Sequence, residues 1–327
     1  MFPDTRPKIG IENWKGRSYS EGMRLPTFTL EKKKLPRVIF SVSPSPQASL
    51  QDISLLMKKA YEMGISYFDL PSQNHVESFR ELRALTEDEG LFGFCHISAE
   101  QGVSFLGRPL HTFEAKVVST LKKSFFPPEL IRELKTLGVW NSRLFFPAVS
   151  SPEVFTQKEI DRFALDPSRF DKALSLFRPG ESPFLFFGGK YGDWIMGLGR
   201  VDLLKDMTRK VREKGFTPIF SARWATFVLP KAKSIDVAAY AIPINRSWSL
   251  FDLARACTLV KKFDRPLISL NPFADGKLLP DSEEALSFLF KELRISGAIA
   301  EMGSEEEGRN VLKAAEAFPS VIPPRRT

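Results

Sequence analysis

The segment GISYFDLPSQNHVESF, residues 64–79, holds the side chains best suited to chemistry. An apolar run ends there in a carboxylate, Asp69, which is typical of a buried strand that delivers an acid to its carboxyl end. A second apolar run, LFGFCHIS at 91–98, carries His96 near its own end. If the two runs are neighbouring parallel strands, the two side chains lie within reach of each other. An Asp–His pair can accept or donate a proton near neutral pH.

Two other interpretations of this pair stay open. His96 is, in the simplest one, a structural histidine bonded to a buried carboxylate. A metal site would need at least three ligands, and His75 is the only further histidine near Asp69 in the sequence. We expect His75 and Asn74 to line a pocket beside the pair rather than to bind a metal.

The elements that must position these residues are short apolar runs that alternate with amphipathic segments. Strands are predicted at 37–43, 65–70, 91–98, 217–222, 235–243, 266–272 and 296–302, with a fourth strand at either 142–149 or 183–189. Eight strand–helix units predict an α/β fold, a (β/α)8 TIM barrel. An open doubly wound sheet is disfavoured because the first turn, SVSPSPQAS, lacks the glycine-rich dinucleotide fingerprint.

The predicted organisation has three parts. Residues 1–34 form an N-terminal extension, 35–316 the barrel with an irregular insertion around 150–200, and 317–327 a C-terminal tail. The chain of 327 residues is 43% hydrophobic, enough for one large core, and its 29 phenylalanines are predicted to fill that core. A helix at 128–138 begins with proline and ends with glycine.

Charge and cysteine content exclude several classes of protein. The net charge is +8, but basic residues do not form a stripe interleaved with aromatics, so nucleic-acid binding is not expected. No apolar run approaches the length of a membrane span. The two cysteines, Cys95 and Cys257, lack metal spacing and indicate buried free thiols in a reducing compartment. We therefore expect a cytoplasmic protein, and the sequence leaves open whether it forms a homo-oligomer or binds a partner protein.

Four segments, in this order, resemble those of the aldo-keto reductase family. They are MGISYFDLPSQNHVESF as its second strand, LIRELKTLGVWNSRLFF as its third helix and fourth strand, PLISLNPFADGKL as its seventh strand and phosphate loop, and ISGAIAEMGSEEEGRNVLKAA as its last strand and helix. The resemblance spans 35–316 but is poor over 150–200. It implies the barrel and an oxidoreductase that uses a nicotinamide cofactor on a small carbonyl or alcohol.

The resemblance also implies a catalytic tetrad of Asp, Tyr, Lys and His at the ends of the second, third and fourth strands. In that family the tyrosine donates a proton, and the lysine lowers its pKa. Here Asp69 is kept, Asn74 stands at the tyrosine position and His96 at the lysine position. Pro147 or Ala148 stands at the histidine position. Ordinary reductase activity is therefore expected to be weak or absent.

The cofactor contacts that the resemblance implies are only partly kept. They are Ser221 for the nicotinamide amide, Asn271, Phe273 and Gly276 in the phosphate loop, and Asn310 for the adenine. Leu270 stands where an aromatic ring would stack on the nicotinamide, and three glutamates at 305–307 would repel a 2′-phosphate. NAD(H) is therefore expected to bind better than NADP(H), and binding of neither stays open.

Three functions remain open from the sequence. The first is a divergent oxidoreductase that binds a small molecule at the barrel mouth. The second is a catalytically inactive barrel, a pseudoenzyme that serves as a binding or partner subunit. The third is a non-redox enzyme that uses Asp69 and His96. The segment FFGGKYGDW also offers Lys190 and Tyr191, either as a relocated catalytic pair or as part of a packed loop.

Overall fold

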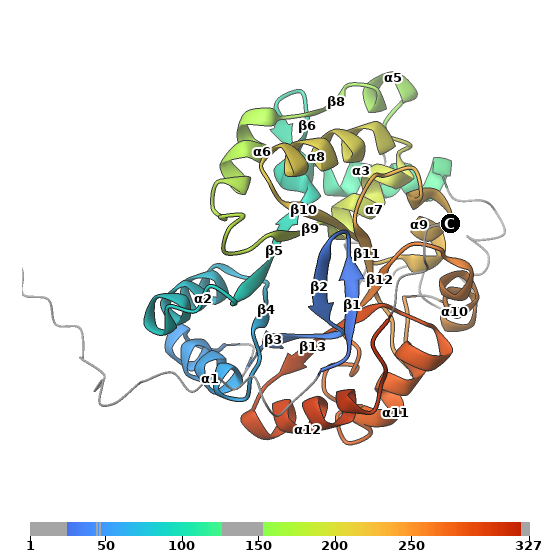
Figure 1. Cartoon of the computed structure of the whole chain (residues 1–327). Helices are drawn as coiled ribbons and strands as arrows, with labels where there is room; N and C mark the ends of the chain where they lie inside the picture. The colour runs from blue at the N-terminus through green and yellow to red at the C-terminus, as the bar shows by residue number, and fades with distance from the viewer. Residues whose placement is uncertain (1–24, 44, 46, 126–152, 251, 322–327) are drawn as a thin grey trace, which may run out of the picture.

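The computed structural model describes residues 25–43, 45, 47–125, 153–250 and 252–321. In this part of the chain eight parallel strands close into a barrel, and their order around the barrel is their order in the sequence (Figure 1). They are β3 (Val38–Val42), β4 (Tyr67–Leu70), β5 (Phe92–Ser98), β9 (Phe184–Gly188), β10 (Thr217–Ser221), β11 (Ala239–Pro243), β12 (Leu267–Leu270) and β13 (Gly297–Met302). The last strand, β13, pairs with the first, β3, so the predicted TIM barrel is confirmed.

Helices surround the barrel on its outer side (Figure 1). They are α1 (Leu50–Glu62), α2 (Gln73–Thr86), α7 (Gly189–Gly197), α8 (Val201–Glu213), α9 (Ala225–Ala232), α10 (Leu253–Lys262), α11 (Ser282–Ser287) and α12 (Glu305–Glu316). The first of them shows why the sequence folds this way. Ser49 and Asp52 form a reciprocal capping box at its start, and Gly64 follows its end with a φ of 90°.

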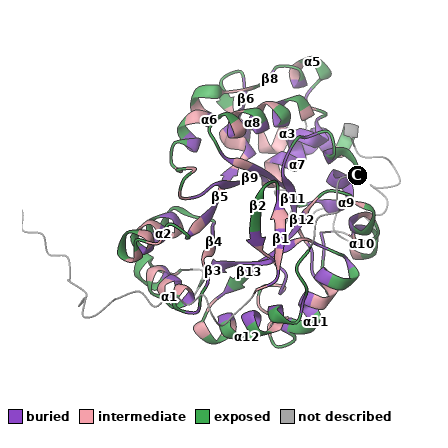
Figure 2. Ribbon diagram, viewed as in Figure 1, coloured by how far each residue is buried: buried purple, intermediate pink, exposed green. Residues whose placement is uncertain are grey.

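The core has two layers, one inside the barrel and one between the strands and the helices. Most of each barrel strand is coloured as buried in Figure 2. Residues that alternate along each strand point either into the barrel or outward against the helices. The barrel interior holds stacked rings, with the centroids of Phe94 and Phe184 4.5 Å apart. Cys95 lies in the outer layer, where burial raises the pKa of its thiol to about 12. Both cysteines are free, as predicted, but only Cys95 is buried, and Cys257 is half-buried.

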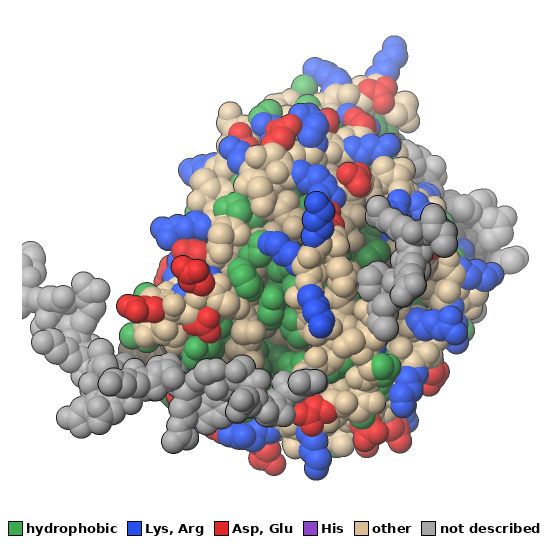
Figure 3. Space-filling model, in the orientation of Figure 1, with side chains coloured by type: hydrophobic (Ala, Val, Ile, Leu, Met, Phe, Trp, Pro, Cys, Tyr) green, Lys and Arg blue, Asp and Glu red, His purple; other side chains and the backbone are tan. Residues whose placement is uncertain are grey.

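A hairpin closes the amino end of the barrel. Its first strand, β1 (Thr27–Leu30), lies within the predicted N-terminal extension, and its second, β2 (Lys33–Pro36), crosses the predicted boundary at residue 34. The apolar side chains of both strands pack into the barrel interior. Figure 3 views the molecule from this side: hydrophobic side chains lie toward the centre, charged ones surround them, and no histidine is visible. The opposite end, where the strands have their carboxyl termini, is therefore the end available for a site.

Arg37 fastens the hairpin to the end of the described chain. Its guanidinium donates hydrogen bonds to the carbonyl oxygens of Ile295, Ser296 and Pro319 and lies 3.8 Å from the ring centroid of Phe290. Burial lowers the pKa of this side chain to about 10. The seam between β3 and β13 is thus held by a side chain as well as by strand pairing.

The insertion begins earlier in the sequence than predicted, and its described part contains regular strands and helices. It lies between β5 and β9 and contains a three-stranded sheet of β6 (Val103–Phe105), β7 (Arg108–Pro109) and β8 (Phe163–Leu165), with helices α3 (Glu114–Thr120), α5 (Gln157–Ile160) and α6 (Pro167–Leu174). The prediction of an irregular stretch over 150–200 is wrong for its described part, because 184–188 are a barrel strand. The segments 128–138 and 142–149 lie outside the described residues.

The fourth barrel strand is therefore β9. It pairs with β5 on one side and β10 on the other, with His96 opposite Phe186 and Ser221 opposite Gly188. Of the two candidates, the run at 183–189 is the correct one. Among the described helices none is long and apolar enough to cross a membrane.

Candidate functional site

The barrel mouth is ringed by the last inward-facing residue of each strand. Alternation from the residues that fill the barrel interior assigns these positions to Ser41, Asp69, Gly188, Ser221, Pro243, Leu270 and Glu301. On β5 the last inward-facing residue is Ser98, and His96 is the inward-facing residue before it. Titratable groups among these residues come only from β4, β5 and β13. The strands from β9 to β12 contribute a glycine, a serine, a proline and a leucine, so the chemistry of the mouth lies on one side.

Asp69 and His96 touch, as predicted. The Nε2 atom of His96 lies 2.5 Å from Oδ1 of Asp69, across the neighbouring strands β4 and β5. The imidazole ring stacks on Phe186, with ring centroids 4.7 Å apart and an angle of 18° between the planes. The carboxylate side chain is 6% exposed and the imidazole 31% exposed. The ring is thus fixed on one edge and one face while another part of it reaches solvent.

This geometry determines which nitrogen can react. An ionised carboxylate can only accept a hydrogen bond, so Nε2 of His96 carries the proton that it donates to Asp69. Nδ1 of His96 is then the free nitrogen. Among the described residues Nδ1 has no hydrogen-bond partner. An imidazole oriented by a carboxylate, with its second nitrogen free, can take a proton from a bound molecule and return it.

The other two predicted catalytic residues do not join this pair. His75 is held locally, because its Nδ1 lies 2.7 Å from Oγ of Ser72 and its Nε2 lies 2.7 Å from the carbonyl oxygen of Val42. Asn74 is exposed in the first turn of α2. In the described ranges no three His, Cys, Asp or Glu side chains are arranged to hold a metal ion, so His75 is not a third ligand.

Glu301 is a site residue that the sequence analysis missed. It lies at the carboxyl end of β13 on the inward face, two residues after the buried Ile299. In the pairing register Glu301 is opposite Ser41, and Ser41 is opposite Asp69. Glu301 is exposed at this end of the barrel, and partial desolvation, together with Asp275 and Asp69, raises its pKa. The alternation of the run GAIAEM is the signal that would have found it.

Lys190 and Tyr191 are bound by Glu114 at the start of α3. Lys190 Nζ lies 3.0 Å from Oε1 of that carboxylate, and the Tyr191 hydroxyl donates to the same oxygen. Burial and the neighbouring Glu114 raise the pKa of Tyr191. A catalytic tyrosine acid needs the opposite effect, so the relocated pair is not supported, and a packed segment is the better description.

Asp193, one turn further along α7, is a buried carboxyl group at the same end of the barrel. Its Oδ2 accepts the backbone N–H groups of Arg223 and Trp224, at 2.8 and 3.0 Å, just after β10. Its Oδ1 has no hydrogen-bond partner, and burial raises the pKa of the group to about 8. Asp193 therefore anchors the helix after β9 to the loop after β10.

The predicted cofactor residues are mostly committed to contacts within the protein. The Ser221 hydroxyl accepts the backbone N–H of Gly189 at 3.0 Å and donates to the carbonyl oxygen of Phe187 at 3.3 Å. The Asn271 side chain exchanges two hydrogen bonds with Asp275, each 2.8 Å long. These hydrogen bonds stabilise turns at the mouth and use part of the hydrogen-bonding capacity of both side chains.

The remaining predicted cofactor positions are distributed around the last two strands. Phe273 is buried in the core, Gly276 completes a left-handed turn with a φ of 85°, and Asn310 is exposed on α12. Within the described part of the chain, none of these three residues interacts with Asp69 or His96.

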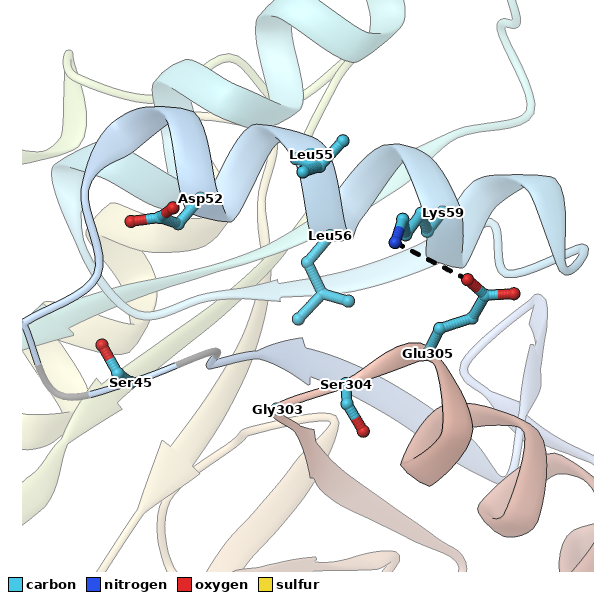
Figure 4. A pocket seen from close by; sticks show the side chains of 8 residues that line it. All are labelled: Ser45, Asp52, Leu55, Leu56, Lys59, Gly303, Ser304 and Glu305. Atoms are coloured by element: carbon cyan, nitrogen blue, oxygen red, sulfur yellow. Dashed lines mark ion pairs between the residues drawn. The ribbon is translucent and has the colours of Figure 1, made fainter.

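A hollow of about 480 Å³ lies between α1 and the turn that leads from β13 into α12 (Figure 4). Lys59 and Glu305 face each other across it, 3.8 Å apart. Arg309, the cation nearest to the glutamate run, is paired with Glu305 at 2.7 Å. Asp69 and His96 do not line this hollow.

Comparison with solved structures identifies the architecture. The aldo-keto reductase AKR11C1 from Bacillus halodurans, in its holo form, matches with a TM-score of 0.53 and 13% identity, over 91% of this chain and 93% of that one. The fold is that of an aldo-keto reductase. A Pseudomonas aeruginosa protein described as a candidate member of that family matches with a TM-score of 0.48 and 11% identity, over 87% of this chain and 91% of that one. No family model and no curated protein matches the sequence.

Because the fold is shared, each tetrad position that the family resemblance implies can be located by the number of the barrel strand that carries it. Because β9 is the fourth strand, the family's histidine position falls at its end, near Gly188. The earlier assignment to Pro147 or Ala148 is wrong in placing the strand, and those residues lie outside the described part of the chain. Gly188 carries no side chain, so a tetrad histidine is absent at the end of this described strand.

Proposed function

We propose that this chain is a proton-transfer enzyme with the aldo-keto reductase fold, whose centre is the Asp69–His96 pair. The observation that carries the proposal is the 2.5 Å contact between a carboxylate that is almost fully buried and an imidazole that is 31% exposed at the barrel mouth. His96 Nδ1 takes a proton from a small polar molecule at the mouth, or gives one to it. Asp69 stabilises the imidazolium that forms.

A nicotinamide cofactor does not fit the described residues well. The hydroxyl of Ser221, which would hold the nicotinamide amide, is already bonded twice within the protein. Leu270 offers no aromatic face. Asp275 lies in the loop that would bind the pyrophosphate, and together with Glu301 it gives that part of the mouth a negative charge. We therefore write the reaction without hydride transfer.

The oxidoreductase and the inactive barrel are the rival proposals. An oxidoreductase would use His96 as the proton donor toward a small carbonyl, and of the two dinucleotides it would prefer NAD(H). That preference follows because Arg309, paired with Glu305, is not free to grip a 2′-phosphate. An inactive barrel would keep the Asp–His contact only for stability.

The test is proton exchange with solvent. A panel of small carbonyl, hydroxy and amino compounds is incubated in D₂O with the enzyme and followed by proton NMR. We expect at least one compound to exchange or convert. In His96→Gln the rate should fall by about 10²–10⁴, the usual contribution of general acid–base catalysis. His111→Gln is the matched control, because His111 is an exposed histidine also bonded to a carboxylate, Glu100 at 2.8 Å.

Two results would contradict the proposal. If no compound distinguishes the wild type from His96→Gln, the pair is structural, and the inactive barrel becomes the better description. If calorimetry detects tight binding of NADH or NADPH, the oxidoreductase is restored.

A further inference from the structure

Two pairs of aromatic rings stack along the seam between β5 and β9. Phe94 lies opposite Phe184 in the pairing register, and their ring centroids are 4.5 Å apart with 14° between the planes. Two residues further along each strand, His96 lies opposite Phe186, with centroids 4.7 Å apart and 18° between the planes. Phe94 and Phe186 connect the two pairs, with centroids 5.8 Å apart. The imidazole is thus the last ring of a column whose other rings are phenylalanines.

Phe186 gives the imidazole a fixed support. The residue is 1% exposed and belongs to the core inside the barrel. Phe94 packs against its ring, and β9 pairs with a strand on each side, so both the ring and the backbone that carries it are held. Because side chains in a close-packed interior stay in one well-defined rotamer, Phe186 presents a constant plane to His96.

The hydrogen bond to Asp69 does not by itself orient the imidazole. The contact of 2.5 Å at Nε2 fixes one atom of the ring. The torsion about the Cβ–Cγ bond of a histidine is broad and roughly two-fold, so one contact at the edge does not select one plane. Stacking supplies the second constraint, because rotation of the imidazole away from the plane of Phe186 would lose the contact between the rings. The carboxylate and the phenyl ring together determine where Nδ1 of His96 points.

The face of Phe186 also stabilises an imidazolium. A phenyl ring carries negative potential on its face and attracts a cation placed over it, and this attraction is stronger where water is excluded. Proton uptake at Nδ1 of His96 places a positive charge over that face, while Asp69 stays at the edge of the ring. Phe186 therefore acts on the charged form of His96 as well as on its orientation.

We propose that Phe186 is the positioning residue of the Asp69–His96 pair. Its ring holds the imidazole in the orientation in which Nε2 meets Asp69 and Nδ1 is free, and it stabilises the imidazolium that forms during proton transfer. Phe186 is too deeply buried to touch a molecule at the mouth, so it acts only through His96. The effect on a reaction rate rests on the proposed function, whereas the effect on the orientation of the imidazole does not.

The experiment compares Phe186→Met with Phe184→Met. Either change removes a ring and keeps an apolar side chain. Phe184 is the matched control because it lies on the same strand and face and is also 1% exposed, but the ring on which it stacks is Phe94. In urea denaturation the two variants should lose stability to a similar extent. Phe186→Leu and Phe184→Leu form a second pair that removes the same two rings if a methionine variant does not fold.

The first measurement is the ¹⁵N NMR spectrum of the imidazole nitrogens. The chain has three histidines, so loss of signals in His96→Gln identifies those of His96. In the wild type and in Phe184→Met, the neutral ring of His96 should carry its proton on Nε2. In Phe186→Met the proportion of the other tautomer should rise about two- to tenfold, as expected for the loss of one aromatic pair.

The second measurement is the steady-state kinetics of a compound that reacts in the D₂O assay. In Phe186→Met kcat should fall about threefold to thirtyfold, as expected for the loss of a cation–π interaction. KM should stay the same, because the buried ring does not contribute to substrate binding. Phe184→Met should change neither constant.

Two results would overturn the proposal. If Phe186→Met and Phe184→Met give the same His96 spectrum as the wild type, the ring of Phe186 only fills the core, and any reaction that depends on His96 still supports the proposed function. If Phe186→Met changes KM and leaves kcat unchanged, the ring contributes to substrate binding instead of positioning His96. If no compound reacts with the wild type, the proposed function fails, and the spectra alone decide whether Phe186 positions His96.

Discussion

Asp193, a buried carboxyl group, should make the free energy of unfolding of this protein decrease as pH rises. Burial raises its pKa to about 8 in the folded chain, against an ordinary value of 3.8. Between these two pH values the folded state keeps a proton that the unfolded state releases, so the free energy of unfolding decreases as pH rises. The contribution is fully present below pH 3.8 and is lost as pH rises to about 8. At 1.36 kcal/mol per pH unit the whole window corresponds to about 6 kcal/mol.

The assay is urea denaturation of the wild type and Asp193→Asn at a series of pH values. The amide oxygen can keep both backbone hydrogen bonds but carries no proton that titrates. From about pH 5 to about pH 8 the wild type should therefore lose about 4 kcal/mol relative to this variant. Asp202→Asn is the control: its neighbour Arg200 lowers the pKa of that carboxyl, so its difference from the wild type should be flat above about pH 5. A difference between the wild type and Asp193→Asn that stays constant over this range would refute the reasoning.

Four other predictions test the site and its support. Asp69→Asn should release the fixed imidazole tautomer, seen by ¹⁵N NMR, and slow any reaction that depends on the imidazole by about 10²–10⁴. Tyr191→Phe should leave that reaction unchanged in the same assay, because the raised pKa of the hydroxyl makes it a poor acid. With NADPH and a panel of aldehydes, turnover in a steady-state assay should stay below about 1 s⁻¹, the low end for enzymes. Gly188→Ala should lower the free energy of unfolding, measured by urea denaturation, by about 2 kcal/mol or more, because φ is 119° and a Cβ would lie 2.4 Å from the carbonyl oxygen of Ser221. Gly199→Ala is the control: φ there is 78°, a Cβ would meet open space, and the free energy of unfolding should fall by less.

The barrel could be predicted because its strands are short apolar runs bounded by turn residues. The runs predicted at 65–70, 217–222 and 296–302 contain β4, β10 and β13 almost to the residue. The fourth strand could not be chosen in the same way, because 142–149 and 183–189 are both apolar runs containing adjacent phenylalanines. Only pairing with β5 and β10 distinguishes them, and that pairing depends on residues distant in the sequence.

The site was predictable where it depends on strand order alone. Asp69 and His96 end neighbouring strands, so their contact follows from the barrel. The ring atoms of His75 and the hydroxyl of Ser221 bond to carbonyl oxygens of other segments, those of Val42 and Phe187, and no pattern in the sequence reveals such partners. Glu301 was overlooked because its segment was interpreted only as a cofactor-binding strand and helix.

The seam between β3 and β13 constrains how the barrel can be made during synthesis. Arg37 and β3 leave the ribosome long before Ile295 and β13, with more than two hundred residues between them. Until then β3 has one free edge, and the guanidinium of Arg37 lacks the carbonyl oxygens and the aromatic ring that surround it in the finished protein. Exposed strand edges can pair with other chains. The nascent chain should therefore depend on chaperones until its last strand is released, and folding should be completed only after translation of that strand.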